Sequence, residues 1–532
     1  MTHVLSPQAV RTALDAGDPL AVLDLRDSLD YVQGHIPECT PVRRRDLEQR
    51  LPTLVPNRTT PLVLCDQRGD RAARDARWLT TLGYEDVSAI DGGFEAWRRA
   101  GFDVVESVGD VHATALNYTS KRFGEAVDAD RDLPRLSPEE LAALREHDDV
   151  LVVDVRNPEE YDRWGTIPGS VNVEGVDIAR YVEDLRDPDQ PVVVHCAGRT
   201  RSIIGTATLD ALGVSNVYEL ENGTMGWQLA GYELAEGSGR PEGVDPTPER
   251  LEQRRESVET LVDDVGVSRL TPTEFDDLRA SVAADQSIYL IDVRREAEYE
   301  QGHLPGSTWV SGGQLIQTAE AHLAVRTAEI VLVSETHLRA GITAYWLAEM
   351  GFPRVSVLDG GVTAWADAGR PLVEGNDTPA PVGWDEVHEV VTFVDARTLS
   401  DRLDDEAVTV VDVDSPEAFT DGHVPGARWV SRYDLETDLE AGTFEPTDGV
   451  VLTCRDGVRS AYAAGAVGTT VDGVRVSALD GGFRAWTDAG LPVDSGEEGM
   501  VRPPRTAERK PYGQGRPEMR QYLEWEEHLV ER

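Results

Sequence analysis

Short apolar runs recur along the chain and are separated by longer stretches with helical patterns. Each run is continuous in hydrophobicity rather than alternating, which is typical of strands buried on both faces. Residues 72–82 and 202–212, which lie between such runs, have the pattern of helices. The alternation predicts α/β domains, each with a small, mainly parallel sheet and helices on both faces.

Helix-start signals precede three of these segments. Ser6, Ser137 and Thr271 each stand directly before a proline, as an N-cap followed by a first-turn proline does. Another Thr-Pro pair at 247–248 predicts a helix within one linker. We place the linkers near residues 107–133, 237–267 and 375–390.

One sequence unit occurs four times. Each copy has an apolar run ending in aspartate, a GHxPG-like turn, a second apolar run, and a closing turn followed by tryptophan. The second run ends 41 or 42 residues after the aspartate. The aspartates are Asp24, Asp154, Asp292 and Asp412, and the residues ending the second run are Cys65, Cys196, Ser334 and Cys454.

The repeat period is long enough for each copy to fold as its own domain. We place the domains at residues 4–106, 134–236, 268–374 and 391–495, with a tail at 499–532. Tyr522, Trp525 and Leu529 have helical spacing in this tail. We expect a helix that docks on the last domain, and a partner-binding tail is the alternative.

Composition and charge narrow the function classes. The chain is 40% hydrophobic and 28% charged, which excludes a wholly disordered protein. A net charge of −46 excludes general nucleic-acid binding and electrostatic membrane attachment. Of the 51 basic residues, two are lysines, Lys121 and Lys510.

The remaining sequence features indicate a soluble, cytoplasmic protein. We find no signal peptide and no apolar run of about 18 residues. The 4 cysteines form no CxxC pair and no Cys/His cluster, so neither a disulfide scaffold nor a metal site is expected.

The candidate chemistry lies in the loops that follow the second apolar run. Each loop opens a helix, so its N–H groups and the helix N-terminus face the first loop residue and stabilise negative charge there. Arg201 and Arg459 add a fixed cation. We therefore expect Cys196 and Cys454 to be ionised near neutral pH and to act as nucleophiles. Gly457 lets the fourth loop curl without a Cβ penalty.

These signatures, DVR, GHxPG, C-x-x-x-x-R and DGG with tryptophan, together resemble rhodanese domains of the sulfurtransferase superfamily. The resemblance covers all four repeats, about 400 of the 532 residues. It implies a double displacement, in which a cysteine thiolate takes sulfur from a small anionic donor such as thiosulfate. The persulfide then passes sulfur to cyanide, sulfite or a thiol. No metal or organic cofactor is implied.

Two copies depart from the family pattern at the cysteine loop. The third has Ser334, which cannot carry a persulfide, followed by Glu335, which repels anions. We interpret this domain as non-catalytic. In the first copy Arg71 comes sixth after Cys65, a seven-residue loop length that resembles the related cell-cycle tyrosine and dual-specificity phosphatases. Asp66 and Asp70 in that loop argue against tight anion binding.

The fourth copy has Asp414 where the DVR motif has arginine. We expect this change to loosen a structural ion pair while the catalytic loop stays intact. CRDGVRS at Cys454 is similar to the family's active loop, and closer to the thiosulfate type than to the mercaptopyruvate type. Arg455 is a candidate for steering thiosulfate into it.

The leading hypothesis is a thiosulfate sulfurtransferase in which Cys454 and Cys196 carry persulfides and Arg459 and Arg201 bind the anion. Cys65 is a weaker third candidate. One alternative is phosphoester hydrolysis by the first domain through Cys65 and Arg71. Another is a partner-binding or redox-sensing scaffold of partly degenerate domains.

Two-domain members of the family pair an inactive with an active domain. We therefore expect the third domain to pack beside the fourth, and the first beside the second. The sequence leaves the physiological donor and acceptor, and the oligomeric state, undetermined.

Overall fold

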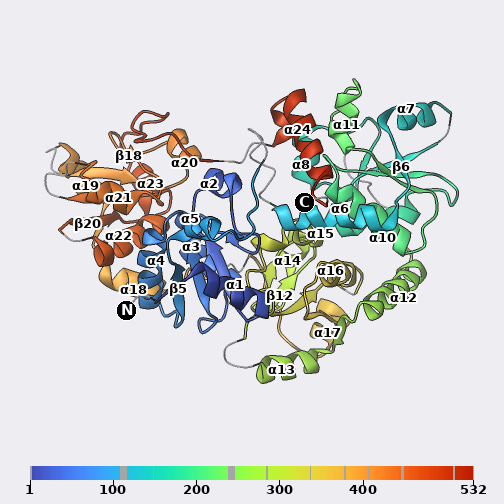
Figure 1. The fold of residues 1–532 in the computed structure, drawn as a ribbon, viewed down its shortest axis with the longest axis horizontal. Coiled ribbons are helices and arrows are strands. Elements are labelled where there is room, and N and C mark those ends of the chain that lie inside the picture. The colour runs from blue at the N-terminus through green and yellow to red at the C-terminus, as the bar shows by residue number, and fades with distance from the viewer. Residues whose placement is uncertain are drawn as a thin grey trace. The chain divides into compact units, whose positions relative to one another are not determined.

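The computed structural model describes most of the chain, and its sheets are drawn in Figure 1. The described residues are 3–107, 117–147, 149–237, 246–282, 286–335, 337–376, 379–404, 408–444, 449–471, 473–506 and 510–530. Four five-stranded sheets are present in them, and all strand pairs within the sheets are parallel. The predicted α/β class with four tandem domains is confirmed. Residues 108–116, 238–245 and 377–378 of the predicted linkers lie outside the described residues.

The first two domains have the same succession of elements. The first contains β1 (His3–Leu5), α1 (Pro7–Ala16), β2 (Ala21–Asp24), α2 (Ser28–Gln33), β3 (Thr40–Pro41), α3 (Leu47–Leu54), β4 (Leu62–Cys65), α4 (Asp70–Thr81), β5 (Val87–Ile90) and α5 (Gly93–Arg99). The second contains β6 (Arg135–Leu136), α7 (Pro138–His147), β7 (Leu151–Asp154), α8 (Pro158–Trp164), β8 (Val171–Asn172), α9 (Ile178–Tyr181), β9 (Val192–His195), α10 (Thr200–Ala211), β10 (Val217–Leu220) and α11 (Gly223–Leu229).

The third and fourth domains repeat this succession. The third contains β11 (Ser268–Leu270), α13 (Pro272–Ser281), β12 (Ile288–Asp292), α14 (Glu296–Gln301), β13 (Thr308–Trp309), α15 (Gly312–Gln317), β14 (Glu329–Val333), α16 (Leu338–Glu349), β15 (Val355–Leu358) and α17 (Gly361–Asp367). The fourth contains β16 (Phe393–Val394), α19 (Ala396–Asp404), β17 (Thr409–Asp412), α20 (Pro416–Asp421), β18 (Arg428–Trp429), α21 (Leu435–Glu440), β19 (Val450–Thr453), α22 (Val458–Thr470), β20 (Val476–Leu479) and α23 (Gly482–Asp488).

The sheet order places each candidate loop above the middle of its sheet. In the first domain the order is β1-β5-β4-β2-β3, and the other three sheets repeat it. β4, β9, β14 and β19 are therefore central strands, and their Val/Leu/Ile runs are buried on both faces. The loop after such a strand starts at the carboxyl edge of the sheet, where ligands bind in open α/β sheets.

The sequence signals for helix starts are confirmed in the structure. The Ser6 hydroxyl accepts a hydrogen bond from the Ala9 N–H at 3.2 Å, which caps α1. Thr271 and Glu274 form a capping box at α13. Thr247 caps α12 (Pro248–Asp264), the helix predicted within the second linker. No described helix is long and apolar enough to cross a membrane.

The domains pair in a way that the sequence did not predict. Two compact units comprise residues 1–104 with 379–507, and residues 105–378 with 508–532. The first domain therefore pairs with the fourth, and the second with the third. The expectation that neighbours in the sequence pair, first with second and third with fourth, is wrong. Ion pairs between loop arginines and aspartates of the paired domain hold these pairs together, as described below.

The tail packs on the second domain, so the expectation that it docks on the last domain is wrong. It forms a short 3-10 turn, η6 (Pro511–Gly513), and the helix α24 (Arg516–Glu527). Met519, Tyr522 and Leu523 of α24 bury their apolar side chains against Met225 of α11. Figure 1 shows α24, in red, beside α11 and α6 (Tyr118–Arg131), the helix that precedes the second domain.

Candidate active site

The four candidate loops join a central strand to the following helix. They connect β4 to α4, β9 to α10, β14 to α16 and β19 to α22. Their first residues, Cys65, Cys196, Ser334 and Cys454, are all buried. The geometry of each loop depends on where the nearest carboxylates lie, and in this respect the four loops differ.

The second-domain loop, Cys196 to Arg201, contains no acidic residue. Cys196 Sγ lies 3.6 Å from the hydroxyl of Ser202, at the start of α10. Arg201 forms a two-pronged ion pair with Glu160 of α8, at 2.7 and 3.0 Å. Arg199 pairs with Glu125 of α6 at 2.7 Å, so this helix braces the loop from outside the domain.

A cavity of about 430 Å³ opens beside Cys196. Its walls come from the cysteine loop, α6, α8, α11 and the tail, and Gln317 of α15 in the third domain completes the lining. The lining includes Asn117, Lys121, Glu160, Cys196, Arg199, Thr200, Arg201, Met225, Gln317, Lys510, Tyr512, Tyr522 and Glu526. The Tyr512 hydroxyl donates to Glu160 at 2.6 Å, and Glu526 accepts from the Thr200 hydroxyl at 2.8 Å. The tail is therefore anchored on the loop itself.

The fourth-domain loop is closed by a carboxylate. Asp414 accepts hydrogen bonds from the Arg455 N–H at 2.7 Å and from the Arg459 guanidinium at 2.6 Å. It therefore occupies the donors that would bind an anionic substrate. Arg459 also pairs with Asp46 of the first domain at 3.0 Å. The expectation that Asp414 leaves this loop intact is wrong, because its side chain turns into the loop.

The first-domain loop is filled by its own aspartate. The buried Asp66 carboxylate accepts N–H hydrogen bonds from Arg68 at 3.0 Å, from Gly69, and from Arg71 and Ala72 of α4 at 2.9 and 3.0 Å. These donors form the cradle in which a phosphate or thiosulfate would sit. The Arg71 guanidinium pairs instead with Asp434 of the fourth domain at 2.9 Å.

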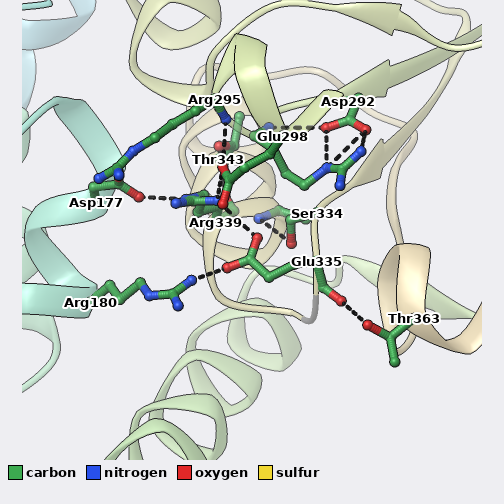
Figure 2. Close-up of polar contacts among 12 residues, drawn as sticks. Asp177, Arg180, Asp292, Arg295, Glu298, Ser334, Glu335, Arg339, Thr343 and Thr363 are labelled. Carbon is green, nitrogen blue, oxygen red and sulfur yellow. Dashed lines mark hydrogen bonds and ion pairs between the residues drawn. The ribbon is translucent and has the colours of Figure 1, made fainter. Parts of the chain in front are cut away.

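The third-domain loop makes contacts with the second domain, as Figure 2 shows. Arg339 pairs with Asp177, and Glu335 pairs with Arg180, both across the domain pair. Arg339 also contacts Glu335 within the loop at 3.0 Å. Ser334 accepts a hydrogen bond from the Ala340 N–H at 3.4 Å. The loop therefore contacts the second domain through Glu335 and Arg339.

Burial raises the pKa of all three loop cysteines, which opposes the ionisation that the sequence predicts for Cys196 and Cys454. For Cys454 burial raises the pKa to about 12; hydrogen bonds from Ser460 oppose this rise, and the charges of Asp414 and Asp456 add to it. For Cys196 burial also raises the pKa, but Arg201 and hydrogen bonds from Ser202 oppose the rise. Among the three loop thiols, Cys196 is therefore the one with an arginine charge that opposes the effect of burial on its pKa together with the serine hydrogen bonds.

Comparison with known proteins gives the family. The model of the rhodanese-like domain matches residues 6–100, 137–230, 271–368 and 395–489. The chain belongs to the rhodanese family. It is similar over 99% of its length to the crystal structure of a thiosulfate sulfurtransferase from Pseudomonas aeruginosa, with 36% identity, 97% of that chain covered and a TM-score of 0.87.

Curated relatives match parts of the chain. A thiosulfate sulfurtransferase of Pseudomonas aeruginosa is 26% identical over 253 residues, 40% of this chain and 89% of the relative. The thiosulfate sulfurtransferase GlpE of Pseudomonas syringae is 36% identical over 97 residues, 18% of this chain and 89% of the relative. These similarities support a rhodanese sulfurtransferase.

The rhodanese domains pair through a repeated ion pair. Asp46, Asp177 and Asp434 stand 22 or 23 residues after the aspartate that ends the first apolar run of their repeat. Each binds the loop arginine of the paired domain, namely Arg459, Arg339 and Arg71. The third rhodanese domain has Gln314 at this position. Among the described residues, the carboxylate that pairs with Arg201 comes from its own domain, Glu160.

Several residues of this site escaped the sequence analysis. Glu219 of β10 is fully buried and lies 3.0 Å from the Ser202 hydroxyl, and burial raises its pKa to about 7. The other copies have Ala89, Val357 and Ala478 there. The signal in the sequence was a single acidic residue in an apolar strand, which could have pointed to Glu219. The sequence predicts no site role for Lys121 and Lys510, although both line the cavity.

Gly457 and Arg455 are the remaining sequence candidates, and two further residues, His195 and Cys39, lie in or near the domain cores. Gly457 has a left-handed backbone with φ of 84°, and a Cβ there would lie 2.9 Å from the Gly482 nitrogen. The side chain of Arg455 is 59% exposed, and its guanidinium lies 3.8 Å from the carboxylate of Asp421, which is not a loop residue. His195 contacts the Ser170 hydroxyl at 2.9 Å. Cys39 is a buried free thiol packed in the first-domain core.

Proposed function

We propose that the chain is a thiosulfate sulfurtransferase whose working nucleophile is Cys196. One observation carries the proposal. Cys196 is the loop cysteine with no carboxylate in its loop, and it opens into a cavity whose charged lining has four basic and two acidic side chains. A carboxylate would repel the thiosulfate dianion and occupy its donors. The relatives that are named thiosulfate sulfurtransferases support this choice of donor.

The proposed reaction has two displacements on sulfur. The Cys196 thiolate attacks the outer sulfur of thiosulfate, a new S–S bond forms, and sulfite leaves with the electron pair of the broken S–S bond. Cyanide then attacks the terminal sulfur of the persulfide, thiocyanate leaves, and the thiolate is regenerated. Arg201 and the loop N–H groups bind the anion, while Ser202 lies within hydrogen-bond distance of the sulfur that carries the charge.

The test compares three single variants, Cys196→Ala, Cys454→Ala and Cys65→Ala. Thiosulfate-to-cyanide transfer should fall to background in the first and persist in the other two. Peptide mass mapping after thiosulfate treatment should find one added sulfur on the Cys196 peptide, which cyanide removes. Loss of transfer in Cys454→Ala, with Cys196→Ala active, would place the chemistry in the fourth domain.

Within this proposal, the other three rhodanese domains have a structural role. Their loop arginines are held by aspartates of the paired domain, and the first and fourth loops are filled by Asp66 and Asp414. Phosphoester hydrolysis through Cys65 and Arg71 finds no support in this geometry, because Asp66 takes the phosphate-binding donors. A scaffold role is therefore assigned to these domains and not to the whole chain.

A further inference from the structure

Glu219 is a buried acid at a position that is apolar in the other three rhodanese domains. It lies in β10 beside Arg135 of β6. The corresponding residue pairs of the other sheets are Val4 with Ala89, Arg269 with Val357, and Phe393 with Ala478. These sheets form without an acid there, and a buried carboxylate costs free energy unless its oxygens are bound. A role other than stabilising the sheet is therefore indicated for Glu219.

One hydroxyl group joins Glu219 to the sulfur of Cys196. The Ser202 Oγ lies 3.0 Å from Glu219 Oε1 and 3.6 Å from Cys196 Sγ. It also lies 2.7 Å from the carbonyl oxygen of Arg199. The second carboxylate oxygen, Oε2 of Glu219, accepts a hydrogen bond from Arg135 Nε at 2.7 Å. Because Cys196, Ser202 and Glu219 are all buried, they form a hydrogen-bonded chain away from solvent.

The fourth domain has the same contact between cysteine and serine without the acid. Ser460 Oγ lies 3.4 Å from Cys454 Sγ, and Ala478 stands at the position of Glu219. The first and third domains have alanine in place of the serine, at Ala72 and Ala340. The serine and the acid therefore occur together only in the second domain, whose cysteine is the proposed nucleophile.

The protons of this chain couple the ionisation of its two ends. Ser202 has one hydroxyl proton, and an ionised Glu219 is a strong acceptor for it. The sulfur then faces an oxygen lone pair, which suits a thiol and not a thiolate. Because Arg135 binds Oε2, a proton on Glu219 sits on Oε1 and faces Ser202, so the carboxyl group no longer competes for the hydroxyl proton. A negative charge at either end therefore disfavours one at the other end.

The charged groups that face Glu219 are arginines from two elements. Arg135 lies on β6 and Arg199 in the Cys196 loop, and both also pair with Asp128 of α6, at 2.5 and 3.0 Å. The neighbouring strand β9 places Val194 beside Glu219. Burial raises the pKa of Glu219 to about 7, and the two arginines oppose the rise. Glu219 therefore changes its charge within the pH range in which the enzyme is assayed.

The surroundings of Cys196 contain further titratable groups. Those that line its cavity are Lys121, Glu160, Arg199, Arg201, Lys510, Tyr512, Tyr522 and Glu526. They are the same in the parent and in a variant at Glu219, so a difference in the pH dependence of Cys196 between these two proteins reports on Glu219.

We propose that Cys196 and Glu219 share one negative charge through Ser202, and that an ionised Glu219 thereby restrains thiolate formation at Cys196. The inference rests on the proposed role of Cys196. When the charge moves to sulfur, the S–H bond of Cys196 breaks, its proton passes to Ser202 Oγ, and the Ser202 proton passes to Glu219 Oε1. The net charge of the chain stays the same. Glu219 is a positioning residue, because it reaches the sulfur through Ser202.

The test measures the reactivity of Cys196 in the full-length protein at pH 6 and pH 8.5. Alkylation by iodoacetamide, a neutral reagent, is followed by peptide mass mapping, so Cys454 in the same sample is the matched control. Glu219→Gln keeps the shape of the side chain and removes its charge. The ratio of the Cys196 rate constant in this variant to that in the parent should rise about 10-fold from pH 6 to pH 8.5, the effect of one pKa unit. The ratio for Cys454 should stay constant. A Cys196 ratio that is equal at the two pH values would overturn the proposal.

Two further variants test the fold and the route. Arg135→Gln keeps Glu219 and removes a cation that favours its ionised form, so it should also speed alkylation of Cys196 more at pH 8.5 than at pH 6. If Glu219→Gln does not fold, this variant decides, and an effect equal at both pH values overturns the proposal. In a Ser202→Ala background the effect of Glu219→Gln should shrink, because the hydroxyl link is absent. An undiminished effect there would also overturn the proposal.

Sulfur loading separates this inference from the proposed function. With thiosulfate, the Cys196 peptide of Glu219→Gln should show the same gain at pH 8.5 as it does with iodoacetamide. If Cys196 takes up no sulfur but its alkylation shows the gain, the proposed function fails and the coupling stands. If sulfur loads and neither reaction shows the gain, the coupling fails and the proposed function stands.

Discussion

The loops at Cys196 and Cys454 have the same length and the same place in their domains, yet they present opposite electrostatic surroundings. At Cys196 the loop is free of acids and faces a cavity whose charged lining has four basic and two acidic side chains. At Cys454 the carboxylate of Asp414 binds a loop N–H and the loop arginine, and Asp456 lies 3.7 Å from the sulfur. The Cys454 loop is closer in sequence to the family's active loop. Its N–H donor at Arg455 and its arginine, Arg459, nevertheless already bind Asp414.

The comparison shows that the carboxylates around a cysteine loop determine its charge and its available donors as much as the loop residues do. Arg201 and Arg459 are the same residue at the same loop position. Arg201 keeps one carboxylate partner, Glu160, and borders the cavity. Arg459 is shared between Asp414 and Asp46, so it has one carboxylate partner more than Arg201 has.

The largest expected effect comes from removing these two arginines in turn. Arg201→Gln should lower kcat/KM for thiosulfate about 100-fold, since it removes the cation that binds the anion and favours the Cys196 thiolate. Arg459→Gln should leave kcat/KM within about 2-fold and lower the melting temperature instead, because it leaves Asp414 and Asp46 without their partner. Steady-state kinetics and thermal unfolding of both variants check this. The reverse pattern would assign the reaction to the fourth domain.

A carboxylate introduced into the Cys196 loop should raise the pKa of the cysteine and slow sulfur loading, as the acids do at Cys454. Gly198 occupies the position of Asp456, and a Cβ there meets the flexible end of Met225 at 2.9 Å. Gly198→Asp should raise the pKa of Cys196 and slow sulfur loading by thiosulfate about 10-fold more than Gly198→Asn does. The isosteric asparagine controls for the added volume. Equal loading rates in the two variants would mean that the loop charge is irrelevant.

The reciprocal change belongs to the same prediction. Asp414→Asn keeps an acceptor for the Arg455 N–H and removes the charge beside Cys454. The pKa of Cys454, about 12, should then fall, and its alkylation by iodoacetamide at pH 9 should become several-fold faster. Peptide mass mapping over time measures the rate. An unchanged rate would show that access to the buried sulfur limits its reactivity.

Much of the fold followed from local sequence signals. The continuous Val/Leu/Ile runs predicted central parallel strands, and Ser6 and Thr271 before proline predicted helix starts. These signals act over a few residues, so they can be read without knowing the neighbours in space. The left-handed turn at Gly457 was predictable for the same reason.

The domain pairing and the electrostatics of the loops depend on contacts between distant segments. Asp46 and Arg459 are 413 residues apart, and nothing local to either one indicates the other. Two signals were present all the same. An aspartate recurs at one position in three copies and is Gln314 in the other, and the rare lysines mark the cavity. Both are patterns across the whole chain, and their meaning depends on which domains pair.

The smallest effect concerns the aspartates behind the two loops. Asp154 pairs with Arg156 at 2.6 Å, whereas Asp412 has lost this partner to the Asp414 substitution. Burial raises the pKa of Asp412 to about 8, and the charge of Asp414 adds to the rise. The folded state thus holds a proton that the unfolded state releases near its ordinary pKa of about 4, so stability falls as the pH rises from about 4 to 8.

Asp412→Asn should remove this slope, because asparagine resembles the protonated acid and can still accept from the Asp414 N–H. The variant should match the parent near pH 4 and exceed it in stability at pH 7.5. Asp154→Asn should instead lose stability at pH 7.5, since Arg156 would be left buried without its charge partner. Denaturant unfolding at the two pH values measures both. A variant with the parent's pH slope would show that Asp412 is ionised in the fold, and that the fourth loop tolerates two adjacent buried charges.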